Sequence, residues 1–201
     1  STPIKSSAAS DVYKRQRIDG VDIRDYDLFE LRSRLGVIPQ KAFLFNGTIA
    51  DNIRFGKPDA TMEEVMQAAK TAQAYDFIME KEHGFEEEIT EGATNVSGGQ
   101  KQRLSIARAL ARKPEILAFD DSFSALDYRT DAKLREGLAK QLHDTTKIIV
   151  AQRISTIRHA DKIIVLDRGE AVGMGTHEEL MQNCEVYREI ATSQLSAAEL
   201  A

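Results

Sequence analysis

The chain has 201 residues, of which 42% are hydrophobic and 29% are charged, a composition typical of a globular protein and not of a disordered one. Its formal net charge of −5 argues against a protein held to nucleic acid or to an anionic membrane by bulk charge. Every apolar run is far shorter than the roughly 20 residues of a membrane-spanning helix, and a single cysteine allows no internal disulfide, so we expect a reducing, cytosolic environment.

The beginning of the chain differs from the rest in composition. Residues 1–16 are small and polar and show no sustained periodicity, so we expect a disordered tail, or one that does not belong to the natural protein. From Arg17 onward, short apolar runs alternate with helical patterns. In this part we predict helices at Tyr26–Leu35 and Thr61–Met79 and a strand at Gly36–Pro39.

Capping residues delimit the helical patterns in the middle of the chain. Thr61 and Glu64 have the spacing of a capping box, in which each side chain bonds the backbone N–H of the other residue. A further helix is predicted to begin after Ser97 and to end near Pro114, which cannot continue it. We expect the basic residues of this helix to form its outer face: Lys101, Arg103, Arg108 and Arg112.

Three nearly continuous apolar runs follow, at Ile116–Phe119, Lys147–Ala151 and Lys162–Leu166. Runs that are apolar on both faces are typical of buried strands in a parallel sheet. The glycines between 169 and 175 indicate a short hairpin-like segment. The strand–helix–strand order predicts an α/β fold. The helices of this half are predicted at Thr130–Leu142, around Ile154–His159 and, as one or two helices, at Glu178–Leu195.

The sharpest chemical signal is the segment Asn95–Gln100, with the sequence NVSGGQ. Two glycines behind a serine let the backbone approach a ligand closely, and the free N–H groups of a helix start attract an anion. Taken alone, the sequence SGG favours an ordinary N-cap turn over a ligand site.

A second signal follows the first of the apolar strands. Ile116–Phe119 ends in Asp120 and Asp121, and carboxylates at the C-terminal tip of a buried strand lie where ligands bind in open α/β sheets. An aspartate there typically holds Mg²⁺ beside nucleotide phosphates. Because Ser124–Asp127 follow directly, an ordinary solvent-exposed strand end explains the pattern less well.

Together these residues closely resemble the nucleotide-binding domain of ATP-binding cassette (ABC) transporters, from about residue 17 to residue 195. Asn95–Gln100 resembles the family signature motif, Ile116–Asp120 the Walker B strand and Ser124–Asp127 the D-loop. Gln40 matches the Q-loop glutamine, and the segment after it is similar to that of multidrug-type exporters.

The resemblance implies a fold, a chemistry and cofactors. The fold would be an α/β domain of the P-loop NTPase type over residues 17–201, with an inserted helical subdomain at about 47–112. ATP and Mg²⁺ would be the cofactors, with Asp120 and Gln40 at the metal. The implied catalytic residues are Asp121, Gln152 and Gln40, and the implied nucleotide-binding residues are Ser97, Gly98, Gly99, Gln100 and Asp127.

The sequence departs from the family in the phosphate-binding loop. A P-loop needs the pattern G-x-x-x-x-G-K-[ST], whose backbone N–H groups grip the phosphates. Lysine is followed by Ser or Thr only at Lys5 and Lys70, and neither has the glycines. We therefore expect a fragment that lacks the first strands and the P-loop, is inactive alone, and exposes a sheet edge and apolar surface.

Two further departures fall on hydrolytic residues. Where Asp121 stands, the family usually has a glutamate as general base, and a carboxylate drawn back by about an ångström can cost about a hundredfold in rate. Where Gln152 stands, the family usually has a switch histidine, whose proton and charge a glutamine cannot carry. The pair resembles the degenerate half of a heterodimeric exporter; a drifted but active homodimer is the alternative.

The resulting hypothesis is an ATPase domain that couples ATP binding and hydrolysis to transport by an ABC exporter. The ATPase domain itself would be soluble, and a transmembrane domain of the same parent chain would hold it at the cytoplasmic face of the plasma (inner) membrane. Ser97–Gln100 would complete the site of a second ABC subunit. The alternative is a soluble ABC ATPase acting on nucleic acid or ribosomes. The exporter-like segment Gln40–Asn52 argues against it, so we expect no nucleic-acid partner.

Overall fold

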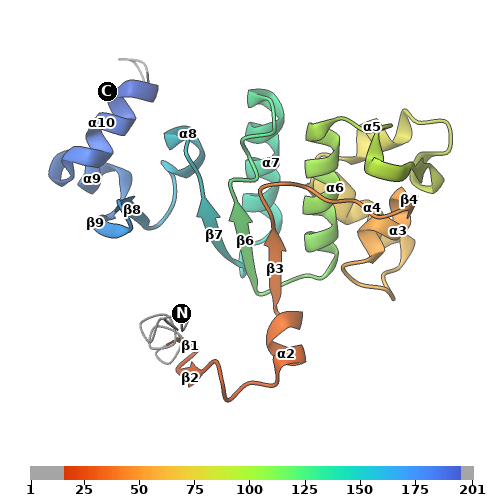
Figure 1. Cartoon of the computed structure of the whole chain (residues 1–201), viewed down its shortest axis with the longest axis horizontal. Helices are drawn as coiled ribbons and strands as arrows, with labels where there is room; N and C mark the ends of the chain where they lie inside the picture. The colour runs from red at the N-terminus through yellow and green to blue at the C-terminus, as the bar shows by residue number, and fades with distance from the viewer. Residues whose placement is uncertain (1–15, 196–201) are drawn as a thin grey trace, which may run out of the picture.

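The computed structural model describes residues 16–195, and a three-stranded parallel sheet lies at its centre. In spatial order the strands are β3 (Leu35–Ile38), β6 (Ile116–Asp120) and β7 (Thr146–Val150). All three end at the same edge, the upper one in Figure 1. The predicted α/β fold with a parallel sheet is confirmed. The tail predicted at residues 1–16 lies almost wholly outside the described residues.

One face of this sheet forms part of the main hydrophobic core. Ile38, Leu117 and Phe119 are almost completely buried there. They belong to the same buried cluster as Leu104 of helix α6 (Gly98–Ala111) and Leu134 of helix α7 (Tyr128–Gln141). The helices on this face therefore hold the sheet whose edge carries the candidate site.

The opposite face of the sheet is apolar but exposed. Val37, Ala118 and Ile148 are paired in register across the three strands, so they point to the same side. Val37 is 64% and Ile148 is 54% exposed, and Val150, further along the same face, is 57% exposed. The prediction of strands buried on both faces is therefore wrong for the described residues, because only one face is covered.

The third predicted strand of the sheet belongs instead to a hairpin. Strand β8 (Ile163–Asp167) pairs antiparallel with β9 (Glu170–Gly175) and with no strand of the parallel sheet in the described chain. Arg168 and Gly169 join the two strands with φ values of 49° and 84°. A two-residue turn with both residues at positive φ returns the chain directly beside itself, which enforces antiparallel pairing.

The predicted helix at Thr61–Met79 consists of two helices, α4 (Met62–Thr71) and α5 (Tyr75–Met79). The break is a Schellman motif, in which the Gln73 N–H donates to Lys70 O and the Ala74 N–H donates to Ala69 O. Gln73 occupies the left-handed position with φ of 56°, where glycine is usual, so the sequence carries no signal for this break.

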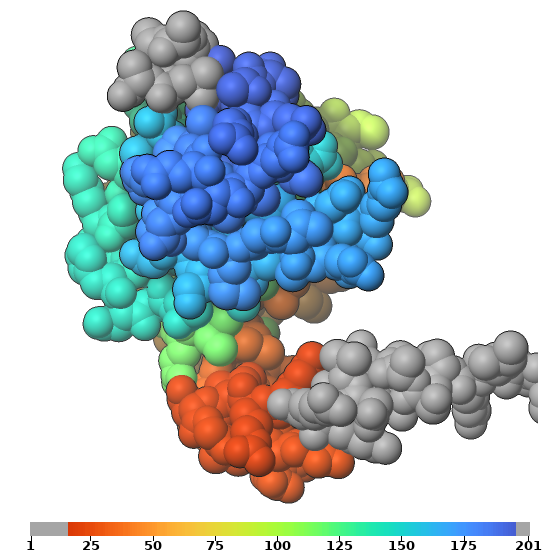
Figure 2. All heavy atoms as spheres, turned by 90° about the vertical axis from the view of Figure 1, so that its left-hand side faces the viewer, coloured from red at the N-terminus to blue at the C-terminus, as the bar shows by residue number. Residues whose placement is uncertain are grey.

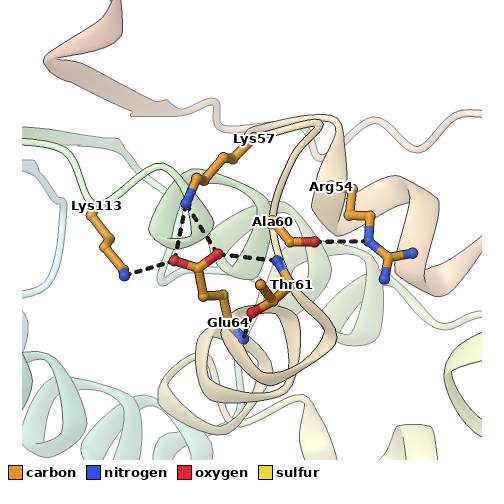
Figure 3. Close-up of polar contacts among 6 residues, drawn as sticks. All are labelled: Arg54, Lys57, Ala60, Thr61, Glu64 and Lys113. Carbon is orange, nitrogen blue, oxygen red and sulfur yellow. Dashed lines mark hydrogen bonds and ion pairs between the residues drawn. The ribbon is translucent and has the colours of Figure 1, made fainter.

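The capping box at the start of α4 is confirmed. The Thr61 hydroxyl accepts the Glu64 N–H, and the Glu64 carboxylate accepts the Thr61 N–H. The same carboxylate accepts hydrogen bonds from Lys57 and Lys113, at 2.9 Å and 2.8 Å (Figure 3). One side chain thus joins the start of α4 to the segments that follow α3 (Ile49–Arg54) and α6.

The C-terminal part forms a second hydrophobic core beside the sheet, on the left in Figure 1 and toward the viewer in Figure 2. The helical segment expected at the C-terminal end consists of two helices, α9 (His177–Asn183) and α10 (Glu185–Gln194), which pack on the β8–β9 hairpin. No helix between residues 16 and 195 is long and apolar enough to cross a bilayer. The remaining elements are β1 (Arg17–Ile18), β2 (Val21–Asp22), α2 (Leu28–Ser33), β4 (Gly47–Thr48), the 3-10 helices η1 (Gly84–Glu86) and η2 (Glu91–Ala93), β5 (Glu88–Ile89) and α8 (Ile154–Ile157).

Candidate functional site

The end of strand β3 is fixed by two buried polar side chains, and this places Gln40. The Ser122 hydroxyl donates to Ile38 O at 2.9 Å, and the Gln102 amide donates to Pro39 O at 3.2 Å. Ser122 is 0% and Gln102 is 1% exposed. Because a buried polar group without a partner is costly, these bonds hold the two carbonyls in one position. The backbone of Gln40, the next residue, is therefore held at a defined position at the sheet edge.

Asp121 lies at the same edge, in an unusual backbone conformation. Its φ is 44°, in the left-handed region that few non-glycine residues adopt. Its N–H donates to Val150 O at 2.9 Å, and its carbonyl accepts the Ser124 hydroxyl at 2.7 Å. These bonds hold the backbone on both sides, so the surrounding structure fixes the direction in which the carboxylate leaves the strand.

The three residues predicted as catalytic meet at one oxygen atom. The Gln152 amide donates to Asp121 Oδ2 at 3.1 Å, and the Gln40 amide donates to the same atom at 3.4 Å. These residues are distant in the sequence and come from the ends of β3, β6 and β7. The arrangement presents a carboxylate and two amide groups, which together can accept, donate and orient hydrogen bonds around a polar substrate.

Asp120 is the last residue of β6 and is exposed at this edge. Within residues 16–195, no group donates a hydrogen bond to its carboxylate, which is therefore available to a ligand. A carboxylate and the amide oxygen of Gln40 are oxygen donors of the kind that Mg²⁺ prefers. The described residues hold no cluster of three His, Cys, Asp or Glu side chains suited to a metal ion. Mg²⁺ usually takes only one or two carboxylates from the protein and keeps waters and phosphate oxygens as its other ligands.

The predicted signature segment forms the N-terminus of α6. Ser97 is the N-cap: its hydroxyl accepts the Gln100 N–H at 3.3 Å, and its own N–H donates to the Gln100 side chain at 2.9 Å. In the described part of the chain, the N–H groups of Gly98 and Gly99 have no protein partner. A β-carbon at Gly98 would meet no atom within 4 Å. The start of this 14-residue helix is thus open and suited to an anion.

The signature segment lies beside the predicted D-loop. A β-carbon at Gly99 would stand 3.4 Å from Ala125 O, so the helix start packs closely on that loop. Asp127 caps α7, because its carboxylate accepts the Thr130 N–H at 2.9 Å. Hydrogen bonding to the side chain and then to the backbone of Thr130 holds the pKa of Asp127 below its ordinary value. The structure therefore assigns the Asp127 side chain to the helix start.

The predicted outer basic face of α6 is wrong for two of its four members. Arg108 donates to Asn52 and to Phe43 O, and its guanidinium lies over the rings of Phe45 and Phe55. Arg103 donates to Gln73 O at 2.7 Å and lies over the Phe77 ring. Burial lowers the pKa of both arginines, because it disfavours the charged guanidinium, and the hydrogen bonds to backbone carbonyls offset this cost.

Sequence reasoning missed Ser122, Gln102 and Gln194. Gln102 carries a usable signal, since it is a long polar residue on a buried face of α6 that is otherwise apolar except for Ser105. Gln194 carries none: it is an exposed glutamine near the end of α10, yet its side chain contacts the backbone of Gln152.

The chain is similar in sequence and fold to proteins that are already known. The family model described as ABC transporter matches residues 6–124. A putative multidrug export ATP-binding/permease protein of Bacillus subtilis, YgaD, is 46% identical over 90% of this chain. The beta-(1→2)glucan export ATP-binding/permease protein NdvA of Rhodopseudomonas palustris is 46% identical over 91% of it. A solved structure of a bacterial Atm1-family ABC exporter with ATP bound covers 96% of the chain, with a TM-score of 0.86 and 38% identity.

The matched relatives are considerably longer than this chain. The alignment covers 31% of YgaD and 30% of NdvA, and the structural match covers 35% of the exporter chain. The chain therefore spans about a third of the length of these relatives.

Proposed function

Because this chain belongs to the ABC transporter family, as the family match over residues 6–124 shows, we propose that its ATPase activity drives export across a membrane. The observation that carries this proposal at the level of residues is the convergence of Gln40 and Gln152 on the Asp121 carboxylate. These three side chains lie at the C-terminal edge of the parallel sheet, where they can form hydrogen bonds with a γ-phosphate and with an attacking water.

The four polar residues at this sheet edge would have different roles in ATP hydrolysis. Asp120 and Gln40 would hold Mg²⁺, which when bound neutralises phosphate charge. Asp121 would orient the attacking water, and Gln152 would donate a hydrogen bond toward the γ-phosphate. The fixed carbonyls of Ile38 and Pro39 support this order, because they set the position from which Gln40 reaches the site.

We propose that the phosphate-binding loop of this site is formed by residues other than these 201. The 201 residues contain no G-x-x-x-x-G-K-[ST] pattern, so none of them forms the cradle of backbone N–H groups that binds phosphates in this class of ATPase. The domain arrangement that we propose is a nucleotide-binding unit from residue 17 onward, with a helical subdomain at about 47–112 that carries the signature segment. The grouping of α3, α4, α5 and α6 on one side of the sheet supports it (Figure 1).

We propose further that this site hydrolyses ATP slowly and that the signature segment serves a second subunit. Aspartate at 121 and glutamine at 152 both weaken hydrolysis, for the reasons of reach and protonation given above. The signature segment is unimpaired, and the open space at Gly98 leaves room for the nucleotide of a partner. The second ABC subunit would supply the competent site, and a transmembrane domain would place the pair at the cytoplasmic face of the membrane.

The experiment is a measurement of ATP turnover by the full-length transporter with its partner. The native subunit is compared with the variant Asp121→Glu plus Gln152→His. A clear rise in turnover supports the slow-site proposal, because the variant restores the reach of the base and the protonatable switch. If turnover is unchanged and the native subunit alone hydrolyses ATP at an ordinary rate, Asp121 and Gln152 suffice for catalysis, and the chain works as a homodimer.

A further inference from the structure

The side chain of Gln194 makes a pair of reciprocal hydrogen bonds to the segment that contains Gln152. Gln194 Nε2 donates to Gln152 O at 2.8 Å, and Gln194 Oε1 accepts the Ile154 N–H at 2.9 Å. One amide group thus satisfies a backbone acceptor and a backbone donor two residues apart, as a neighbouring strand would. We call this contact the Gln194 clasp.

Helix α10 is well placed to hold the clasp still. Tyr187, Ala191 and Leu195 are buried in the C-terminal core, at 1%, 0% and 8% exposure. The Ile154 side chain, 3% exposed, is part of the same core. Residue 154 is therefore attached to the C-terminal unit twice, by its side chain through packing and by its N–H through Gln194.

The other end of the clasped segment reaches the candidate catalytic site. The Gln152 side chain donates to Asp121 Oδ2 at 3.1 Å, and Arg153 donates to Ser124 O at 3.4 Å. Residues 152–154 consequently connect the sheet edge with the C-terminal core. The backbone position of Gln152 decides whether its amide can reach Asp121, and on the C-terminal side the clasp sets that position.

From these contacts we infer that Gln194 is a positioning residue for Gln152, through which α10 is linked to the Asp121 site. Gln194 makes no contact with Asp121, Asp120 or Gln40, and within residues 16–195 its side chain bonds only the backbone of Gln152 and Ile154, so it acts on the Gln152 side chain through that backbone. The inference rests on the proposed function only where it calls the Asp121 site hydrolytic.

The first test is hydrogen exchange in the 201-residue chain. Gln194→Ala should speed exchange of the Ile154 amide by about fivefold, because it removes the hydrogen bond that this N–H donates to the Gln194 side chain. Gln194→Glu should keep the acceptor for Ile154 and show a smaller increase. Ser193→Ala is the matched control, since the neighbouring hydroxyl bonds only within α10, to Ile190 O. Unchanged exchange at Ile154 in Gln194→Ala would overturn the clasp. So would an equal increase at the amide of Leu134 in the main core, because that would report a general loss of stability.

The second test measures catalysis in the full-length transporter whose site carries Asp121→Glu and Gln152→His. Adding Gln194→Ala should lower kcat severalfold and leave KM for ATP unchanged, because the clasp orients residue 152 and does not bind nucleotide. A gain of turnover that is insensitive to Gln194→Ala would overturn the positioning role. If the first two substitutions produce no gain, the slow-site proposal fails, and the exchange experiment then decides the clasp by itself.

Discussion

The Asp121 carboxylate is contacted by side chains that follow two other strands of the sheet. Gln40 and Gln152 bond the same oxygen from opposite neighbours of β6, and the backbone of Asp121 is held at positive φ by Val150 and Ser124. A site of this kind depends on position more than on residue type. A change of one methylene in the carboxylate therefore alters its reach without altering the scaffold that aims it.

Gly98 offers a test of the signature segment at the scale of one residue. Gly98→Asp should abolish ATP turnover in the assembled transporter, because a carboxylate would face the phosphate bound by the partner, and such like-charge contacts cost several kcal/mol. We expect a loss of about a hundredfold or more relative to Gly98→Asn, which has the same size without the charge. Turnover is measured at saturating ATP.

The fold itself should tolerate both Gly98 variants. A β-carbon at this position meets no atom within 4 Å, so the far-ultraviolet circular dichroism and the thermal midpoint should match the native chain. Native turnover in Gly98→Asp would contradict the role in trans, whereas a loss of folded protein would contradict the open helix start described above.

At the scale of elements, polar contacts add to the apolar packing that holds α6 in the main core. Arg108 joins it to Asn52 of α3 and to the segment at Phe43, while Gly56 allows the chain to pass against the backbone at Arg108. A β-carbon at Gly56 would stand 2.0 Å from Arg108 O, a distance that no side chain tolerates. The glycine is thus required by close approach, which its position after a helix did not reveal.

Glu64 gives a second test, because its carboxylate connects three segments (Figure 3). Hydrogen bonds from Lys113, Lys57 and the Thr61 N–H lower its pKa from 4.5 to about 2. A carboxylate whose pKa is lower in the folded state stabilises the fold above its unfolded pKa. That contribution is lost as the pH falls from about 4.5 to about 2. Glu64→Gln should therefore lower the free energy of unfolding at neutral pH and have a diminishing effect toward pH 2.

The measurement is urea unfolding of both proteins across the acid range, with Glu63→Gln as the control. Glu63 lies in the same first turn of α4 but is exposed, and in the described chain no ion pair involves it. The difference between native protein and Glu64→Gln should shrink with acidification, whereas the Glu63→Gln difference should stay nearly constant. A Glu64→Gln difference that is independent of pH would contradict the assigned cause.

Local sequence patterns predicted most of the individual elements, but they did not predict which elements contact one another. The strand that ends in Asp120, the capping box at Thr61 and the hairpin near Gly169 all follow from local patterns. The break at Gln73 does not, because a non-glycine residue holds the left-handed position and Arg103 fixes it from another helix. The same holds for the candidate site: motifs indicated Gln40, Asp121 and Gln152, but the long-range contacts that aim them carry no sequence pattern.

At the scale of the whole molecule, two hydrophobic cores are connected near the candidate site. One core lies between the covered sheet face and helices α3, α4, α6 and α7, and the other lies under α9 and α10. Residues 152–154 run between them. Any relative movement of the two cores would therefore displace residues 152–154, so the candidate site and the C-terminal helix should respond together.

The bare sheet face leads to the last prediction. Val37, Ile148 and Val150 form a continuous apolar surface on strands whose outer edges are unpaired in residues 16–195. Exposed apolar patches and free strand edges both promote association. The 201-residue chain by itself should therefore self-associate with rising concentration, as measured by analytical ultracentrifugation. Replacing Val37 and Ile148 by threonine, which keeps the β-branched shape and adds a hydroxyl, should weaken that association.

Phe29→Ser is the matched control, because Phe29 is 83% exposed on α2, away from the sheet face. If apolar exposure in general drives association, Phe29→Ser should weaken it as much as the double threonine variant does. If the sheet face is responsible, only the double variant should have a large effect, since its two side chains lie in one row across the sheet with Ala118 between them. A native chain that stays monomeric at about 100 µM would show that the exposed face does not bind to itself.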